Sequence, residues 1–294
     1  VGDPLPDPTE TWIFVGDKIA RHTINISRAL ERIFLEVLSN ASDNVGRSRR
    51  AGVDVGKISI EMNQELIRVR NEGLPIPIEM HTETGIIVPE LIFGHMLTSS
   101  NYQENRHEAG VNGIGAKATN ILSRYFSVHV EDSIRHLSYR KTWFNNKSGT
   151  TDAVIEQFPG DKSSVVIEFS PDFQRFSLTP FSGTEGGFPM EYFCLFARHA
   201  LDTSFNAKVP VLFNGVEYHC TDARAYGRFY FGDAVDSGLL HYEWPVDTKI
   251  VKKSKGVQEA EDPNVVPLVE MIVIDTPDEG TLVSFVNCMM TEEG

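Results

Sequence analysis

The sequence predicts a mixed fold of the α/β or α+β class, and three observations lead to this expectation. Hydrophobic residues make up 41% and aromatic residues 10% of the 294 positions, which is enough for a packed core. Apolar residues recur at helical spacing between positions 30 and 41, whereas several shorter apolar runs between turn residues are typical of strands. Since domains average about 150 residues, the length favours roughly two domains.

The elements follow in chain order from periodicity and turn signals. A helix is expected over residues 23–44, followed by a basic, glycine-bearing turn at 46–56. Strands at 57–62 and 66–70, joined by the polar tip 63–65, form a predicted hairpin. The later elements are helices at 89–97, 115–124 and 190–202, strands at 126–131, 165–169, 209–213, 269–274 and 282–287, and a solvated loop at 249–263.

Charge and cysteine content exclude several classes of protein. The formal net charge is −14, so this chain by itself is not expected to bind a nucleic-acid backbone. The net charge does not exclude a local basic pocket for a small phosphate ligand. Cys194, Cys220 and Cys288 are few and far apart, which argues against a disulfide scaffold or zinc cluster and favours a reducing compartment. We find no membrane-spanning run and no signal peptide. Because the chain begins with Val1, we expect a processed protein or a fragment.

The first predicted helix carries a polar strip along one edge of its apolar face. At about 100° per residue, Glu36, Asn40 and Asp43 form this strip. Glu36 and Asn40 are i, i+4 neighbours, so their polar groups can meet at one ligand. A carboxylate can orient water, and an amide oxygen can hold Mg²⁺ that substrate phosphates complete. The polar border of an ordinary amphipathic helix would explain the same spacing.

Two loops could complete a nucleotide site. The loop at 71–77 follows a predicted strand, with Asn71 suited to the polar edge of a base and Gly73 allowing close approach of a ligand. The loop at 110–117 places three glycines before a helix and Lys117 in its first turn, which favours a phosphate cradle. The alternative interpretation of residues 71–77 is an ordinary turn, and that of residues 110–117 is a flexible surface loop.

Two familiar nucleotide motifs fit the sequence poorly. Residues 52–57 resemble a P-loop but have one residue too few between the glycines, and Ile58 follows the lysine where Ser or Thr should bind magnesium. Residues 113–118 fit a dinucleotide fingerprint, with Asp132 at a suitable distance. However, the polar residues 101–108 do not suit the buried strand that this fingerprint requires.

Four segments, residues 36–44, 71–73, 98–102 and 112–117, carry a family resemblance. They resemble the ATPase region of eukaryotic-type type II DNA topoisomerases, members of the GHKL superfamily with the ATPase component of gyrase, MutL, heat-shock chaperones and histidine kinases. The run 89–97 together with 99–102 favours topoisomerase over a chaperone. The resemblance continues through 169–173, 211–215 and 283–287, and so spans essentially the whole chain.

The resemblance implies a fold, an activity and partners. The fold would be the GHKL (Bergerat) two-layer α/β sandwich of the α+β class, a mixed β-sheet with helices on one face, over residues 1–225, followed by an incomplete transducer domain at 226–294. The region would bind ATP and Mg²⁺, hydrolyse ATP and close a homodimer gate for double-strand DNA passage. Double-stranded DNA would bind chiefly to other parts of the full-length enzyme, whose cleavage domain this fragment lacks. The resemblance implies an intracellular protein of a nucleus, viral replication site or virion, neither secreted nor membrane-bound.

The resemblance also assigns roles to individual residues. Glu36 would activate the attacking water, Asn40 would hold Mg²⁺, and Asn71 would contact adenine. The other nucleotide contacts implied are Asp43, Asn44, Ser99, Ser100, Asn101, Gly110, Val111, Asn112, Gly113, Ile114, Gly115, Ala116 and Lys117. Three departures from the family pattern affect this site: Pro75 replaces a loop glycine, Val111 an arginine, and Val165 a threonine near the adenine.

Other functions of the same fold stay open. A chaperone-type or MutL-type ATPase, or a nucleotide-gated dimerisation module without turnover, would use the same first helix. A chaperone-type function would not account for residues 99–101. A histidine kinase fits less well, because His22 does not lie within a predicted dimerisation helix.

Overall fold

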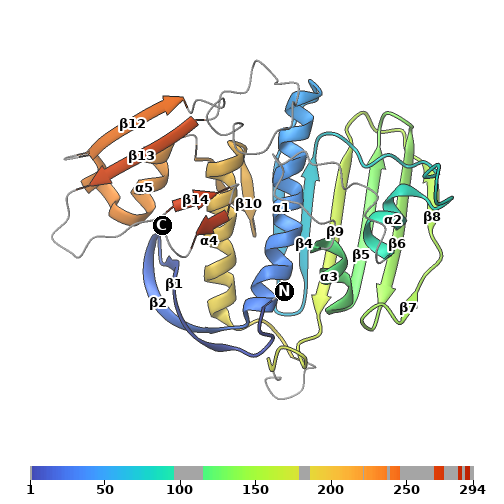
Figure 1. The fold of residues 1–294 in the computed structure, drawn as a ribbon, viewed down its shortest axis with the longest axis horizontal. Helices are drawn as coiled ribbons and strands as arrows, with labels where there is room; N and C mark the ends of the chain where they lie inside the picture. Colours follow the sequence, from blue (N-terminus) through green and yellow to red (C-terminus); the bar gives the residue numbers. More distant parts are fainter. Residues whose placement is uncertain are drawn as a thin grey trace, which may run out of the picture.

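A mixed β-sheet forms the centre of this computed structural model, which describes residues 2–95, 115–178, 186–220, 222–236, 239–245, 268–274, 284–286 and 289–291. Among these residues, nine strands pair in the order β11-β10-β3-β4-β9-β5-β6-β7, with β8 beside β6 (Figure 1). Neighbours run antiparallel except β10 and β3, which are parallel. The strands are β3 (Ile58–Met62), β4 (Ile67–Glu72), β5 (Ser123–Asp132), β6 (Leu137–Phe144), β7 (Gly149–Thr150), β8 (Val154–Gln157), β9 (Ser164–Pro171), β10 (Val211–Phe213) and β11 (Val216–Tyr218).

Helices pack on one face of this sheet, as predicted. Along β4, Ile67 and Val69 are buried on the side of the helices, whereas the alternate residues Arg68 and Arg70 are only half-buried. None of the helices in the described ranges has the length and apolar content needed to cross a membrane. The helices are α1 (Arg28–Arg50), α2 (Val88–Gly94), α3 (Gly115–Ile121), α4 (Met190–Ala207) and α5 (Ala223–Phe231), followed by a 3₁₀ turn at Gly232–Asp236.

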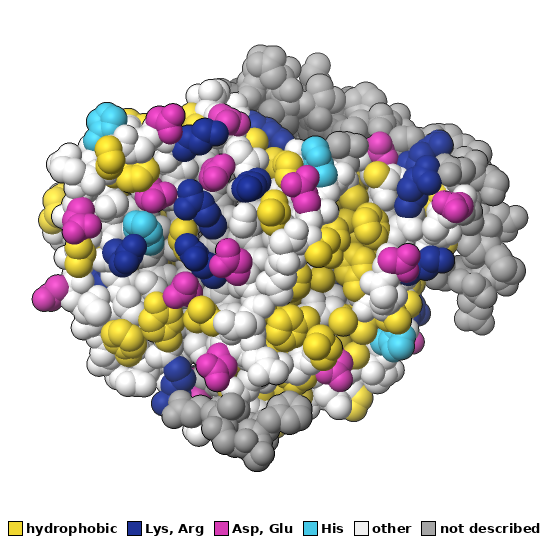
Figure 2. Space-filling view, turned by 180° about the vertical axis from the view of Figure 1, so that it is seen from behind, with side chains coloured by type: hydrophobic (Ala, Val, Ile, Leu, Met, Phe, Trp, Pro, Cys, Tyr) yellow, Lys and Arg dark blue, Asp and Glu magenta, His cyan; other side chains and the backbone are white. Residues whose placement is uncertain are grey.

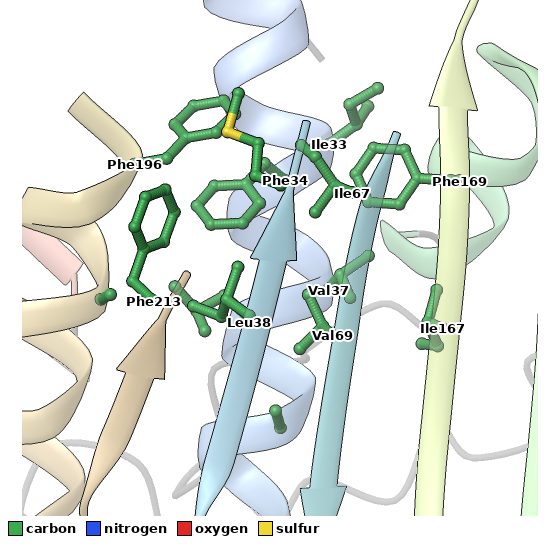
Figure 3. Packing of buried hydrophobic residues seen from close by; sticks show 14 of the residues in the cluster. Ile33, Phe34, Val37, Leu38, Ile67, Val69, Ile167, Phe169, Phe196 and Phe213 are labelled. Atoms are coloured by element: carbon green, nitrogen blue, oxygen red, sulfur yellow. The ribbon is translucent and has the colours of Figure 1, made fainter. Parts of the chain in front are cut away.

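The core lies between α1, α4 and the sheet. In Figure 3, Val37 of α1 lies close to Val69 of β4, and Phe34 lies beside Phe196 of α4. The Phe34 and Phe196 rings stack with their centroids 4.0 Å apart. The apolar stripe expected from helical periodicity is therefore confirmed, since each of its members is buried: Leu30, Ile33, Phe34, Val37, Leu38 and Ala41.

The predicted bounds of the first helix were wrong at both ends. Residues 23–26 belong to strand β2 (Lys18–Ile26), which pairs with β1 (Asp7–Val15), because Ile24 and Ile26 alternate into the core. The helix starts after Ser27, whose Oγ accepts a hydrogen bond from the Leu30 N–H at 3.2 Å. It also continues through the expected turn to Arg50, because Val45 and Ser48 are still buried.

Most other elements agree with the sequence, within small shifts of their ends. The hairpin β3–β4 is confirmed, and Asn63 Oδ1 accepts hydrogen bonds from two backbone N–H groups of its tip. Helix α3 ends at Ile121 because β5 begins at Ser123, and α4 continues to Ala207. Within residues 2–236, the elements not predicted from the sequence are β1, β2, β6, β7, β8, β11, α5 and the 3₁₀ turn at Gly232–Asp236. Further along the chain, the strands at Leu239–Pro245 and Met289–Thr291 were not predicted either. The C-terminal strands are β12 (Leu239–Pro245), β13 (Leu268–Ile274), β14 (Ser284–Val286) and β15 (Met289–Thr291), whereas the loop expected at 249–263 lies outside the described residues.

The face of the sheet away from the helices carries charges of both signs. Arg68 pairs with Glu61 at 3.7 Å, and Arg70 pairs with Glu131 at 3.5 Å. Figure 2 shows basic and acidic side chains interspersed on the face that it displays. Charges of both signs are thus mixed on this face of the sheet.

A buried ionic network joins α1 to α4 and α5. His199 Nε2 lies 2.9 Å from Glu31 Oε1, and its Nδ1 lies 3.6 Å from Asp202 Oδ2. Asp202 also pairs with Arg198 and accepts a hydrogen bond from the Tyr226 hydroxyl at 2.8 Å. Burial alone would raise the pKa of Glu31, but the hydrogen bond and charge of His199, together with nearby arginines, lower it to about 2.

Glu31→Gln tests the pH dependence of this network. The pKa of Glu31 is lower in the folded chain than its usual value of 4.5, so its ionised carboxylate stabilises the fold at pH values above 4.5. This contribution is lost as the pH falls towards 2. We expect the unfolding free energies of wild type and variant to differ most above about pH 5 and to converge near pH 2. Urea unfolding across this range measures the difference, and a difference independent of pH would contradict the assignment.

Candidate functional site

A polar ridge runs along α1 at positions 36, 40 and 44. Glu36, Asn40 and Asn44 follow one another at i, i+4 and i+8, which places the first and last about 12 Å apart along the helix axis. The Glu36 side chain is 22% exposed, Asn40 is half-buried and Asn44 is buried. Asp43 is half-buried beside the ridge. The ridge thus offers a carboxylate and two amides along an extended ligand.

At one end of the ridge, Glu36 meets the start of α3. Arg32 Nε donates a hydrogen bond to Glu36 Oε1 at 2.7 Å. The other carboxylate oxygen faces Gly115, where an added Cβ would overlap it and lie 2.6 Å from Glu36 Cδ. Thr119 Oγ1 donates to the Ile33 carbonyl at 3.0 Å and so holds α3 on α1. Only glycine at position 115 leaves the Glu36 carboxylate in this place.

Lys117 supplies a cation in the first turn of α3. Partial burial, and then the charge of Lys147, lower the pKa of Lys117. Lys117 forms no ion pair with a residue in the described part of the chain. Ala116, by contrast, is buried in the core, which leaves its backbone as the part that could contact a ligand. An anionic ligand beside Glu36 and Lys117 would complete this end electrostatically.

At the other end of the ridge lies the strand end that the sequence predicted. Asn71 of β4 is buried on the same face as Val69, the face that α1 covers. Its register partner in β9 is Val165, which is buried, so an apolar side chain lies beside Asn71 in the neighbouring strand. Base recognition at this end would therefore depend on the amides of Asn71 and Asn44.

A serine on α1 holds the loop after Asn71. The Leu74 N–H donates to Ser48 Oγ at 2.7 Å, and Ser48 Oγ donates to the Asn44 carbonyl at 2.7 Å. Gly73 has φ +125°, and a Cβ there would overlap Ser48 Oγ. The residue after Leu74 is Pro75, which has no N–H to donate. Ser48 was not predicted as a site residue, although its i+4 spacing from Asn44 was a signal.

The donor set suits a ligand that brings its own phosphates. Among the described residues, no group of three or more His, Cys, Asp or Glu could hold a metal ion. A single amide oxygen, as on Asn40, is compatible with Mg²⁺ only when substrate phosphates and waters complete its coordination. Several predicted contacts lie outside the described residues: Ser99, Ser100, Asn101, Gly110, Val111, Asn112, Gly113 and Ile114.

The sequence is similar to curated DNA topoisomerases, although no family model matches the chain. It is 38% identical over 170 residues to DNA topoisomerase 2 of Arabidopsis thaliana, covering 57% of this chain and 11% of that protein. It is 34% identical over 234 residues to DNA topoisomerase 2 of Penicillium chrysogenum, covering 78% and 14%. The chain thus spans less than a fifth of the length of these relatives.

Solved structures give the same result for the fold. The ATPase region of Saccharomyces cerevisiae topoisomerase II superimposes with a TM-score of 0.74 at 28% identity, covering 82% of this chain and 62% of that one. The ATPase and transducer domains of Balamuthia mandrillaris DNA topoisomerase II give 0.70 at 28% identity, covering 83% and 63%. The Thermus thermophilus gyrase B ATPase domain, with 0.51 at 18% identity and coverage of 74% and 54%, shares the fold alone. The predicted GHKL fold is confirmed, and in sequence and fold the chain is similar to the ATPase region of eukaryotic-type type II DNA topoisomerases.

Proposed function

We propose that this chain binds ATP with Mg²⁺ and hydrolyses it. The observation that supports this most directly is the ridge of Glu36, Asn40 and Asn44, with Lys117 near one end and Asn71 near the other. A nucleoside triphosphate is a linear ligand with anionic groups at one end and a polar aromatic base at the other. The triphosphate would lie at the Glu36 end and adenine at the Asn44 end.

The residues of the Glu36 end would carry the chemistry. Glu36 would orient the attacking water and accept its proton, because its free oxygen faces the start of α3. Lys117 would neutralise charge on the terminal phosphate, and Asn40 would hold Mg²⁺ together with the phosphates. When bound, Mg²⁺ supplies further charge neutralisation to phosphoryl transfer. The residues Ser99–Asn101 and Gly110–Ile114 would contribute the remaining phosphate and ribose contacts.

The domain organisation and partners belong to the same proposal. Residues 1–225 would form the ATP-binding domain and residues 226–294 the start of the transducer domain. In the full-length protein, ATP would close a homodimer gate around double-stranded DNA, in a nucleus or at a viral replication site. The interspersed surface charges and the net charge of −14 support DNA contacts chiefly outside this chain.

Asn40→Ala tests the magnesium part of the proposal. We expect ATP affinity in the presence of Mg²⁺ to fall by about tenfold, because the single protein oxygen of the metal is lost. In excess chelator, wild type and variant should bind ATP equally. Isothermal titration calorimetry measures both affinities, and equal affinity with Mg²⁺ present would refute the metal role.

Asn206→Ala is a suitable control for this variant. Asn206 is a half-buried asparagine of α4 whose Nδ2 donates to the Asp202 carbonyl at 2.8 Å. It is not part of the candidate site, so its removal should leave ATP affinity unchanged with and without Mg²⁺. If the wild-type chain binds ATP without turnover even in the full-length protein, the alternative of a nucleotide-gated dimerisation module holds instead.

A further inference from the structure

Ser48 has a fully buried hydroxyl that connects α1 to the loop after β4. Its exposed fraction is 0%, and it both donates to the Asn44 carbonyl and accepts from the Leu74 N–H, each at 2.7 Å. These two bonds use the donor and one acceptor site of the hydroxyl. The Leu74 backbone is therefore fixed against α1 one helical turn beyond Asn44.

The side chain of Asn44 is the second observation at this place. It is 4% exposed, and its Nδ2 has no hydrogen-bond partner among the described residues. A buried N–H without an acceptor is costly, so such a group commonly marks a place where a ligand or water supplies the acceptor. A Cβ added at Gly73 would lie 3.4 Å from this Nδ2, which places the amide beside the loop that Ser48 holds.

The two observations together explain why the Asn44 amide stays unpaired. A loop free to move could turn one of its own carbonyls towards Nδ2 and satisfy it. The bond between Leu74 and Ser48 anchors the loop to α1, and the absence of a side chain at Gly73 allows the close approach that this bond requires. The donor is thereby left available for an acceptor on a bound nucleobase.

We propose that Ser48 is a positioning residue that prepares the nucleobase end of the site. This inference rests on the proposed function, because it assumes that adenine lies between Asn44 and Asn71. Ser48 itself does not touch the nucleotide. It acts by holding the loop of Asn71 and Gly73 at the distance from α1 that the base requires.

Ser48→Ala tests the inference with two probes, ATP and inorganic tripolyphosphate, each with Mg²⁺ and measured by calorimetry. We expect the variant to bind ATP about tenfold more weakly, while its affinity for tripolyphosphate, which has no base, stays unchanged. Gly73→Ala should give the same pattern by a different route, since the added Cβ would overlap Ser48 Oγ and displace the loop. If Ser48→Ala does not fold, the Gly73→Ala variant tests the positioning role of Ser48 in its place.

Ser204→Ala is the matched control. The Ser204 hydroxyl is also 0% exposed, and it hydrogen-bonds to the Val209 and Tyr218 carbonyls at 2.9 Å in a region away from the ridge. Its loss should lower the melting temperature without changing either affinity. An equal loss for both probes in Ser48→Ala, or no loss for either, would overturn the role of Ser48. If wild type binds tripolyphosphate and ATP equally weakly, the proposed ATP site itself fails.

Discussion

Glu36→Gln is expected to lower the rate of ATP hydrolysis by about 100- to 10,000-fold while ATP continues to bind. The amide has nearly the size of the carboxylate, so it fits against Gly115, but it cannot accept the proton of the attacking water. The effect should fall on kcat, because the base acts in the transition state and contributes little to ground-state binding. Steady-state turnover of the full-length protein, together with calorimetry of ATP binding, measures both quantities.

Glu61→Gln provides the comparison for this variant. Glu61 is a carboxylate on the opposite face of the sheet, where it pairs with Arg68 and its side chain is 70% exposed. Its replacement should leave turnover unchanged, because such exposed pairs contribute little. Turnover of Glu36→Gln at the wild-type rate would remove Glu36 from the catalytic role and leave the chain as a binding module.

Phe34→Ala should cost about 3–5 kcal/mol in the free energy of unfolding. The Phe34 ring is fully buried and stacks on Phe196, so the substitution loses contacts on α1 and α4 together and leaves a cavity between them. Urea unfolding followed by circular dichroism measures the loss. Leu5→Ala, at a position 57% exposed, should change the same free energy by less than about 0.5 kcal/mol. A loss at Phe34 as small as that at Leu5 would show that the α1–α4 contact is not formed.

The parts of the fold predicted from sequence are those determined by local pattern. The apolar stripe of α1 follows from helical periodicity, and the β3–β4 hairpin follows from alternation around a polar tip. The strands β1 and β2 were missed although they pair as a local hairpin, with Val15 opposite Lys18. The contacts of this hairpin with the rest of the chain are long-range. Trp12 of β1 meets Tyr230 of α5 with ring centroids 5.1 Å apart, although these two residues are far apart in the sequence and no local pattern connects them.

In the candidate site, too, some residues were predicted from local sequence pattern and others were not. Glu36, Asn40 and Asn71 were predicted because residue type and spacing point to their chemistry. The structure places Glu36 and Asn40 on α1, with Glu36 against Gly115 of α3, and Asn71 at the end of β4. Ser48 was not predicted, because a basic segment with glycine indicated a turn where α1 in fact continues. Its role depends on a bond to Leu74, 26 positions away, which only the folded chain reveals.

The polar ridge of α1 also restricts how this region can change over evolution. One residue inserted between Glu36 and Asn44 would rotate everything after it by about 100° and advance it by about 1.5 Å. Asn44 would then take the buried place of Val45, Val45 would move to the half-buried place of Gly46, and the Asn44 amide would leave the loop of Gly73. Homologues should therefore exchange residues in this stretch without gaps, whereas the loop after Arg50 is free to vary in length.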